Sequence, residues 1–169
     1  MASDALVASI NGPTACEVLD PAQVDAIVAR IGPDPLRLDA DPERAWRRIA
    51  SSRAPIGLLL MDQSVMAGVG NIYRTELLWR QRLHPLAPGR TLDRAGFDRL
   101  WTDARRLLEV GVERGLIVTR GEDRAPARTF KGRVNIFKKP RCPRCRSPVS
   151  GFELAKRRVF ACETCAAPP

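Results

Sequence analysis

Two pairs of cysteines near the end of the chain constrain its folding more than any other feature. Cys142 and Cys145 form one C-x2-C pair, Cys162 and Cys165 form the other, and 16 residues separate the two pairs. Two such knuckles present four thiolates to one zinc ion, and this closed coordination is typical of a structural metal. Redox or disulfide pairs are the alternative, but no thioredoxin-like βαβ pattern surrounds these cysteines. We therefore predict one structural zinc ion.

The residues between the two cysteine pairs predict a basic β-hairpin. Val159 and Phe160 favour a strand, and Lys156, Arg157 and Arg158 are expected at the exposed turn. A segment this short cannot bury a core of its own. The free energy of zinc binding, about 10–16 kcal/mol, therefore becomes its folding energy.

Positive charge is concentrated in the same part of the chain. Residues 119–169 hold 13 Lys and Arg against 4 Asp and Glu, which accounts for the whole net charge of +9. Such a surplus favours a polyanionic partner, because each cation beside a phosphate releases condensed counterions. Nucleic acid is favoured over an anionic membrane, since the region has no amphipathic basic helix.

Helical patterns fill most of the chain before the cysteines. Asp20 and Gln23 form a capping-box pattern that begins a helix ending near residue 31. Further helices are expected from residue 42, over 56–61, over 72–83, and over 92–115 with Thr91 as cap. Glu76 and Arg80 have the spacing of a helix ion pair. Short strands are expected over 5–10 and 133–137.

A glycine turn precedes the helix predicted over 72–83. Gly68 and Gly70 permit backbone torsions that other residues resist, and Asn71 is expected to cap the helix. Free amide groups and the positive end of the helix dipole make such a start suited to phosphate. A plain turn between helices is the alternative.

The segment from Leu59 to Glu76, taken with the four-cysteine finger, resembles the formamidopyrimidine-DNA glycosylase and endonuclease VIII family, and most of all its endonuclease VIII-like members. The resemblance covers about residues 11–165, which correspond to the C-terminal half of the family. It implies a mainly α fold, a helix-two-turn-helix bundle followed by a small four-cysteine zinc-finger β-hairpin. The implied organisation is a residual strand and linker over 1–19, the DNA-binding bundle over 20–116, a basic loop over 117–132 and the zinc finger over 133–169.

The resemblance also implies contacts with the DNA backbone by Asn71 in the turn and by Arg157 in the finger. Asn135 stands where relatives commonly have a tyrosine that contacts phosphate, and an asparagine can still donate a hydrogen bond. The full set of expected DNA-binding residues is Gly68, Gly70, Asn71, Lys131, Asn135, Lys156, Arg157 and Arg158.

Catalysis in the family depends on an N-terminal proline followed by glutamate, carried on a β-sheet domain. This chain begins Met1-Ala2-Ser3, so we expect no catalytic residue and a protein that has lost that domain. The expected function is binding of duplex DNA, including damaged, nicked or abasic duplexes, by a cytoplasmic or nucleoid-associated monomer with no membrane contact. A full-length glycosylase or another repair protein is a candidate partner.

Two other functions stay open at this point. The first is residual lyase activity through Ala2 or a lysine, or one half of a split glycosylase. The second is a zinc-ribbon adaptor for RNA or protein, with the helical body as a scaffold.

Overall fold

The structure is a computed structural model that describes residues 17–169, and the chain divides into two units, Met1–Arg30 and Ile31–Pro169. In the first unit, the described residues form helix α1 (Pro21–Arg30). The amide of Gln23 donates to Asp20 Oδ1 at 2.8 Å, and the amide of Asp20 donates to Gln23 Oε1 at 2.9 Å. These two bonds confirm the predicted capping box. The strand predicted over 5–10 lies outside the described residues.

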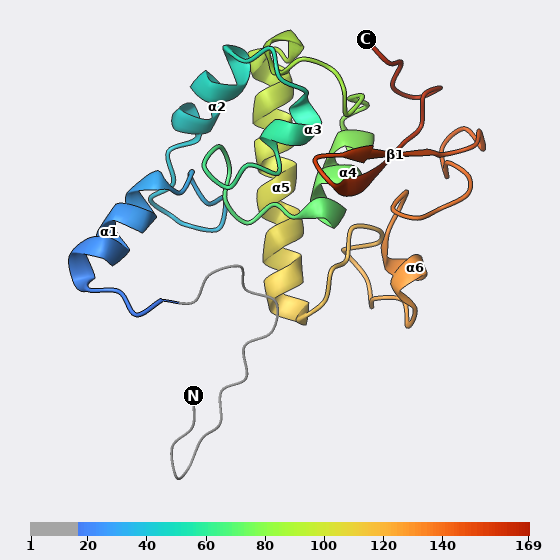
Figure 1. Cartoon of the computed structure of the whole chain (residues 1–169). Helices are drawn as coiled ribbons and strands as arrows, with labels where there is room; N and C mark the ends of the chain where they lie inside the picture. Colours follow the sequence, from blue (N-terminus) through green and yellow to red (C-terminus); the bar gives the residue numbers. More distant parts are fainter. Residues whose placement is uncertain (1–16) are drawn as a thin grey trace. The chain divides into compact units, whose positions relative to one another are not determined.

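The second unit holds the other described elements. Figure 1 shows α5 as its longest helix, with α2 and α4 beside it and the hairpin packed on α4. No helix of the described residues has the length and apolarity needed to cross a bilayer. The elements are α2 (Pro42–Ala50), α3 (Ile56–Leu59), α4 (Asn71–Arg80), the 3-10 turn η1 (Gly89–Thr91), α5 (Arg94–Arg114), α6 (Phe130–Arg133), β1 (Ser150–Leu154) and β2 (Arg157–Ala161).

The core of this unit is built on one face of α5. Its buried side chains follow the spacing of an amphipathic helix: Phe97, Leu100, Ala104, Leu107 and Leu108. The helix begins two residues later than predicted, because the Asp93 carboxylate caps it by accepting the Gly96 amide at 2.7 Å, while Thr91 belongs to η1. The predicted combination of a helical body and a small hairpin is confirmed.

Helix α4 lies in the middle of the unit, and most of its residues are buried. The sequence analysis expected Asn71 as its cap, but Gly70 is the capping residue and Asn71 is the first residue of the helix. Gly68 has a φ of +82°, a torsion that favours glycine, and it turns the chain into this helix.

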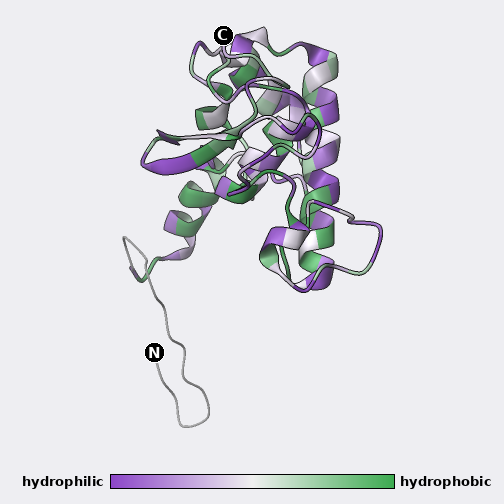
Figure 2. Cartoon of the chain, turned by 90° about the vertical axis from the view of Figure 1, so that its right-hand side faces the viewer, coloured by the Kyte–Doolittle hydropathy of each residue, from purple (hydrophilic) through white to green (hydrophobic). Residues whose placement is uncertain are grey.

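The hairpin pairs β1 with β2 in antiparallel register, from Ser150 opposite Ala161 to Leu154 opposite Arg157. Its turn consists of Ala155 and Lys156, both with positive φ. Of the three residues predicted at the turn, Lys156 lies there, whereas Arg157 and Arg158 lie on β2. The outer part of the hairpin is hydrophilic, whereas its base is apolar (Figure 2).

The strand predicted over 133–137 is wrong. Residues 130–133 form the short helix α6, capped by Thr129, and the chain then turns without pairing in a sheet. The amides of Asn135, Ile136 and Phe137 donate to the carboxylate of Glu76 instead of to a neighbouring strand. A side chain on α4 therefore takes the hydrogen bonds that a β ladder would need.

Candidate functional site

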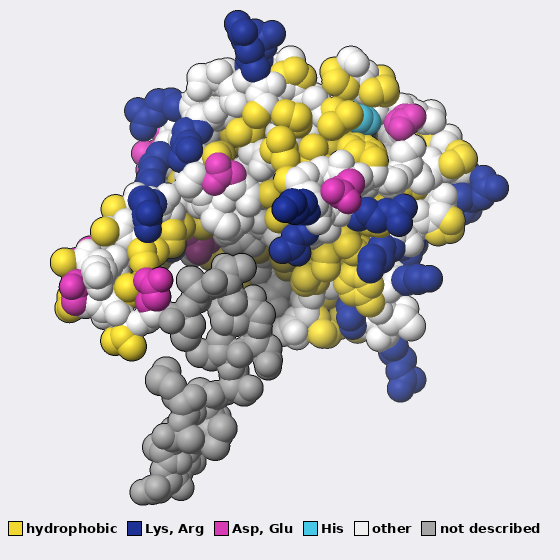
Figure 3. All heavy atoms as spheres, in the orientation of Figure 1, with side chains coloured by type: hydrophobic (Ala, Val, Ile, Leu, Met, Phe, Trp, Pro, Cys, Tyr) yellow, Lys and Arg dark blue, Asp and Glu magenta, His cyan; other side chains and the backbone are white. Residues whose placement is uncertain are grey.

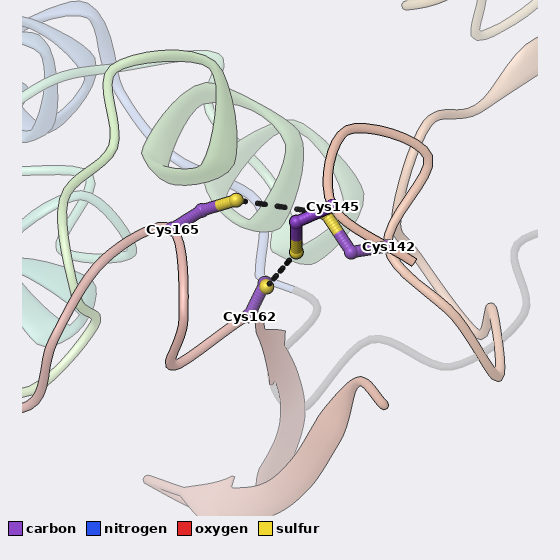
Figure 4. A group of neighbouring side chains, drawn as sticks. All are labelled: Cys142, Cys145, Cys162 and Cys165. Carbon is purple, nitrogen blue, oxygen red and sulfur yellow. Dashed lines mark hydrogen bonds between the residues drawn. The ribbon is translucent and has the colours of Figure 1, made fainter. Parts of the chain in front are cut away.

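The four cysteines of the two C-x2-C pairs converge on one point (Figure 4). The Sγ atoms all lie within 4.8 Å of one another, with 3.4 Å between Cys145 and Cys162 and 3.9 Å between Cys142 and Cys165. Four sulfurs at about 2.3 Å from a tetrahedral ion would lie about 3.8 Å apart. The arrangement therefore fits a single tetrahedral metal ion.

The thiols of this cluster differ in acidity. A hydrogen bond with Ser147 lowers the pKa of Cys145 to about 6, whereas burial and the neighbouring thiols raise the pKa of Cys165 to about 12. The pKa of Cys142 is also lowered, by hydrogen bonds that outweigh its burial, and the pKa of Cys162 is raised by burial. Four thiolates can coexist at these distances only around a positive ion.

The metal cluster is joined to the last turn of α4. Trp79 donates its indole Nε1–H to Cys142 Sγ at 3.3 Å. Arg144, between the cysteines of the first pair, stacks on the Trp79 ring at 3.9 Å and donates to the carbonyls of Trp79 and Arg80. The Trp79 carbonyl also accepts the Arg82 amide at 3.2 Å, and the Arg144 guanidinium thus adds hydrogen bonds at the C-terminal end of α4. Trp79 packs against the small buried cluster of Ile136, Cys142 and Cys162, and not against the core of the helical body.

The other end of α4 is joined to the hairpin. Asn71 Nδ2 donates to the backbone carbonyl of Arg158 at 3.0 Å, and Asn71 Oδ1 accepts a hydrogen bond from the Arg74 guanidinium. These bonds fix the amide with its nitrogen toward β2, and the second N–H of this amide has no partner among residues 17–169. Beside it, the space where a side chain of Gly70 would begin is open. The structure thus brings together the glycine turn and the basic hairpin.

Arg74 is fully buried and forms no ion pair with a carboxylate of the described residues. It donates to the Gly57 carbonyl and to Asn71, and its Nε has no partner. Burial lowers the pKa of Arg74, and the positive charge of Arg157 lowers it further. A guanidinium beside a second cation, with no acidic partner in the described part of the chain, makes this end of α4 favourable to an anion. Arg74 was not among the predicted site residues. Its position three residues after Asn71 places both side chains on the same face of a helix, and this spacing could have indicated it.

Exposed cations surround the Asn71 turn and the hairpin. Lys156, Arg157 and Arg158 form no ion pair within the described residues, and Lys131 on α6 is likewise exposed and unpaired. Figure 3 shows Lys and Arg side chains gathered over the hairpin and α6. This basic surface matches the concentration of charge in the last 51 residues.

Asn135, which the sequence analysis expected to contact phosphate, does not belong to this surface. Its side chain is 9% exposed, and its amide donates to Glu76 Oε2 at 3.0 Å and to the Thr119 carbonyl at 2.6 Å. Both of its N–H bonds are used inside the protein. We therefore withdraw Asn135 from the expected DNA contacts.

Glu76 has a different role from the predicted ion pair with Arg80. Its buried carboxylate accepts five hydrogen bonds, from the Thr119 hydroxyl and from the backbone and side-chain groups of residues 135–137. Arg80 pairs instead with Asp103 at 2.7 Å and Glu122 at 3.0 Å. Glu76 thereby holds both ends of the basic loop against α4.

Comparison with known proteins agrees with this architecture. Residues 31–122 match the formamidopyrimidine-DNA glycosylase H2TH domain, which is more than half of the chain, so the chain belongs to this family. It is 44% identical to endonuclease 8 1 of Mycobacterium tuberculosis, over 92% of this chain and 60% of that protein. It is 33% identical to the formamidopyrimidine-DNA glycosylase of Thermomicrobium roseum, over 88% of this chain and 53% of that protein. The chain thus spans a little over half the length of these relatives, and the predicted membership is confirmed.

Solved structures show the same fold. The Fpg protein of Thermus thermophilus superposes with a TM-score of 0.72 at 31% identity, covering 88% of this chain and 58% of that one. An Fpg mutant of Lactococcus lactis, solved in complex with DNA containing Fapy-dG, gives a TM-score of 0.74 at 24% identity, over 89% of this chain and 57% of that one. The second likeness bears on the fold alone.

Proposed function

We propose that this chain binds duplex DNA through its phosphate backbone, in a repair-related role. The observation that supports this most is the junction of Asn71 with β2, beside the buried Arg74 and the exposed Arg157. One neutral amide and several unpaired cations at a helix start form a site for an anion. The relatives named above are DNA glycosylases and endonucleases by name, which favours DNA over other polyanions.

Within this proposal, each residue has a distinct task. Arg157, Arg158, Lys156 and Lys131 supply charge to phosphates, and Asn71 donates its free N–H bond. Arg74 orients the Asn71 amide and adds positive potential from below the surface. Contacts of this kind position a duplex without reading its sequence. A nicked or abasic duplex is the favoured form, because a deformable duplex costs less to bend.

Arg157→Ala and Asn71→Ala are expected to weaken binding in different ways. Loss of one cation that neutralises a phosphate lowers the slope of log K against log salt by about 0.9, and Arg157→Ala is expected to show that change. Asn71→Ala removes a neutral donor, so it should weaken binding by about tenfold with the slope unchanged. Fluorescence anisotropy on a labelled duplex over a range of salt concentrations measures both quantities.

Arg90→Ala provides the matched control, because Arg90 is exposed on η1 and has no ion pair in the described part of the chain. Its salt slope should stay close to that of the unmodified protein. An Arg157→Ala slope no different from that of Arg90→Ala would rule out Arg157 as a phosphate contact.

The ion at the four-cysteine cluster is proposed to be zinc. Four thiolates in tetrahedral arrangement suit Zn²⁺, and they leave no open position for water or substrate. When bound, such an ion supplies structural stabilisation, and Cys142, Cys145, Cys162 and Cys165 would hold it. Metal analysis of the purified protein should find one equivalent of zinc.

We propose that this chain binds DNA without excising a base. The four-cysteine cluster serves metal binding, and the cations around the Asn71 turn serve contact with phosphate. Borohydride trapping on an abasic duplex tests this against the lyase alternative. We expect gel-shift binding with no covalent adduct. A trapped adduct would show that an amine of this chain attacks the sugar.

A further inference from the structure

A groove of about 790 Å³ lies near the end of α4 that is opposite Asn71. Trp79 and Arg80 line it from the last turn of α4, Arg99 and Asp103 line it from α5, and Arg120 and Glu122 line it from the loop after α5. A helix rises about 1.5 Å per residue, so the groove is about 13 Å along α4 from the Asn71 turn. It is therefore separate from the Asn71 turn.

The floor of the groove is a fixed network of charges. Arg80 donates to Asp103 Oδ2 at 2.7 Å and to Glu122 Oε1 at 3.0 Å. Burial opposes the charge of Arg80, but these two carboxylates outweigh it and hold the pKa of Arg80 above its usual value. Each carboxylate uses one oxygen in this way. Asp103 Oδ1 and Glu122 Oε2 have no hydrogen-bond partner in residues 17–169, so they are free acceptors at the floor.

The rim of the groove carries free donors. The side chains of Arg99 and Arg120 are exposed and form neither an ion pair nor a hydrogen bond with the described residues. Arg144 also lines the groove, but its guanidinium is stacked on Trp79 at 3.9 Å and donates to the carbonyls of Trp79 and Arg80, so it adds charge more than free donors. A ligand here meets guanidinium donors at the rim and carboxylate acceptors below them.

We propose that this groove binds an acidic peptide segment of a partner protein. Aspartate or glutamate side chains of the peptide would accept hydrogen bonds from Arg99 and Arg120, since guanidinium and carboxylate match in geometry and charge. Backbone N–H groups of the same peptide would donate to Asp103 Oδ1 and Glu122 Oε2. The peptide is the one polymer that offers carboxylates and amide donors in alternation.

A nucleic-acid backbone fits this groove less well than a peptide does. A phosphate only accepts hydrogen bonds, so a nucleic-acid strand would leave the two floor carboxylates without donors. The lining combines three acidic residues, Asp98, Asp103 and Glu122, with five arginines, a mixture that suits a ligand with both acceptors and donors. This inference stands on the groove alone and does not depend on DNA binding at Asn71.

The test uses the full chain with its metal and a fluorescein-labelled octapeptide of alternating aspartate and serine, at low ionic strength. We expect saturable binding by anisotropy with a sub-millimolar Kd, and no binding of the matching lysine and serine octapeptide. The double variant R99E/R120E should weaken peptide binding by at least about tenfold. The control variant R53E/R90E has the same change in net charge at two exposed positions outside the groove, and it should bind the peptide nearly as well as the unmodified protein.

Three results would overturn the proposal. The first is no binding at peptide concentrations up to millimolar. The second is equal weakening of peptide binding by R99E/R120E and R53E/R90E. The third is displacement of the peptide by a short DNA duplex, combined with loss of peptide binding in the N71A/R157A variant. The third result would assign the groove to the nucleic-acid surface. Failure of DNA binding itself would leave the peptide result unchanged, so the two proposals fail separately.

Discussion

Chelation of the metal is expected to unfold the cysteine module and to weaken duplex binding by more than about a hundredfold. The apolar cluster around the cysteines is small, with Ile136, Cys142 and Cys162 as its buried members. A two-stranded hairpin of this length is not stable alone in water. Metal binding of roughly 10–16 kcal/mol is therefore the main source of its folding energy. Without it, Arg157 and Arg158 lose their fixed position beside Asn71.

Trp79 gives a direct readout of this change. Its indole N–H donates to Cys142 Sγ, so its ¹H–¹⁵N resonance should move when the metal is removed. Trp46 and Trp101 pack against the core of the helical body, and their resonances should stay in place. Restoring zinc should restore both the Trp79 resonance and the duplex affinity.

Cys145→Ser is expected to reproduce the effect of the chelator, whereas Cys16→Ser leaves all four proposed ligands intact and serves as its control. Unchanged duplex affinity after complete removal of the metal, checked by metal analysis, would mean that the hairpin holds its position without the ion.

Local patterns in the sequence predicted the parts of this structure that depend on near neighbours. The capping box at Asp20, the helix α5 and the two C-x2-C pairs are each set by residues a few positions apart. The sequence also predicted that the two cysteine pairs lie together, because one zinc ion needs four thiolate ligands. These features are the ones that spacing alone determines.

The connections made by α4 were not predictable in this way. The spacing rule paired Glu76 with Arg80, but the partners of Glu76 lie 43 to 61 residues further along the chain. The same bonds bury Asn135 and prevent a strand over 134–137. Long-range partners of a buried carboxylate are fixed by tertiary packing, and a single sequence gives no period or motif that reveals them.

Substitution of Glu76 is expected to have the second large effect, a loss of about 3–5 kcal/mol in the free energy of unfolding. Its two carboxylate oxygens accept five hydrogen bonds from buried donors at 2.7 to 3.0 Å. Glu76→Ala would leave these donors unsatisfied at a cost of about 1–3 kcal/mol for each group that water cannot reach. Glu76→Gln should be nearly as harmful despite its equal size, because its NH₂ group would face the amides of residues 135–137.

Chemical denaturation of the metal-loaded protein measures this loss, and Glu113→Gln is the control. Glu113 is exposed on α5 and has no ion pair among the described residues, so its substitution should change the free energy of unfolding by less than about 0.5 kcal/mol. Since Glu76 also holds the segment that leads to Cys142, its variants should need more zinc to reach full duplex affinity. A Glu76→Gln protein as stable as Glu113→Gln would show that water or backbone rearrangement can replace the carboxylate, and that α4 positions the finger through Trp79 and Asn71 alone.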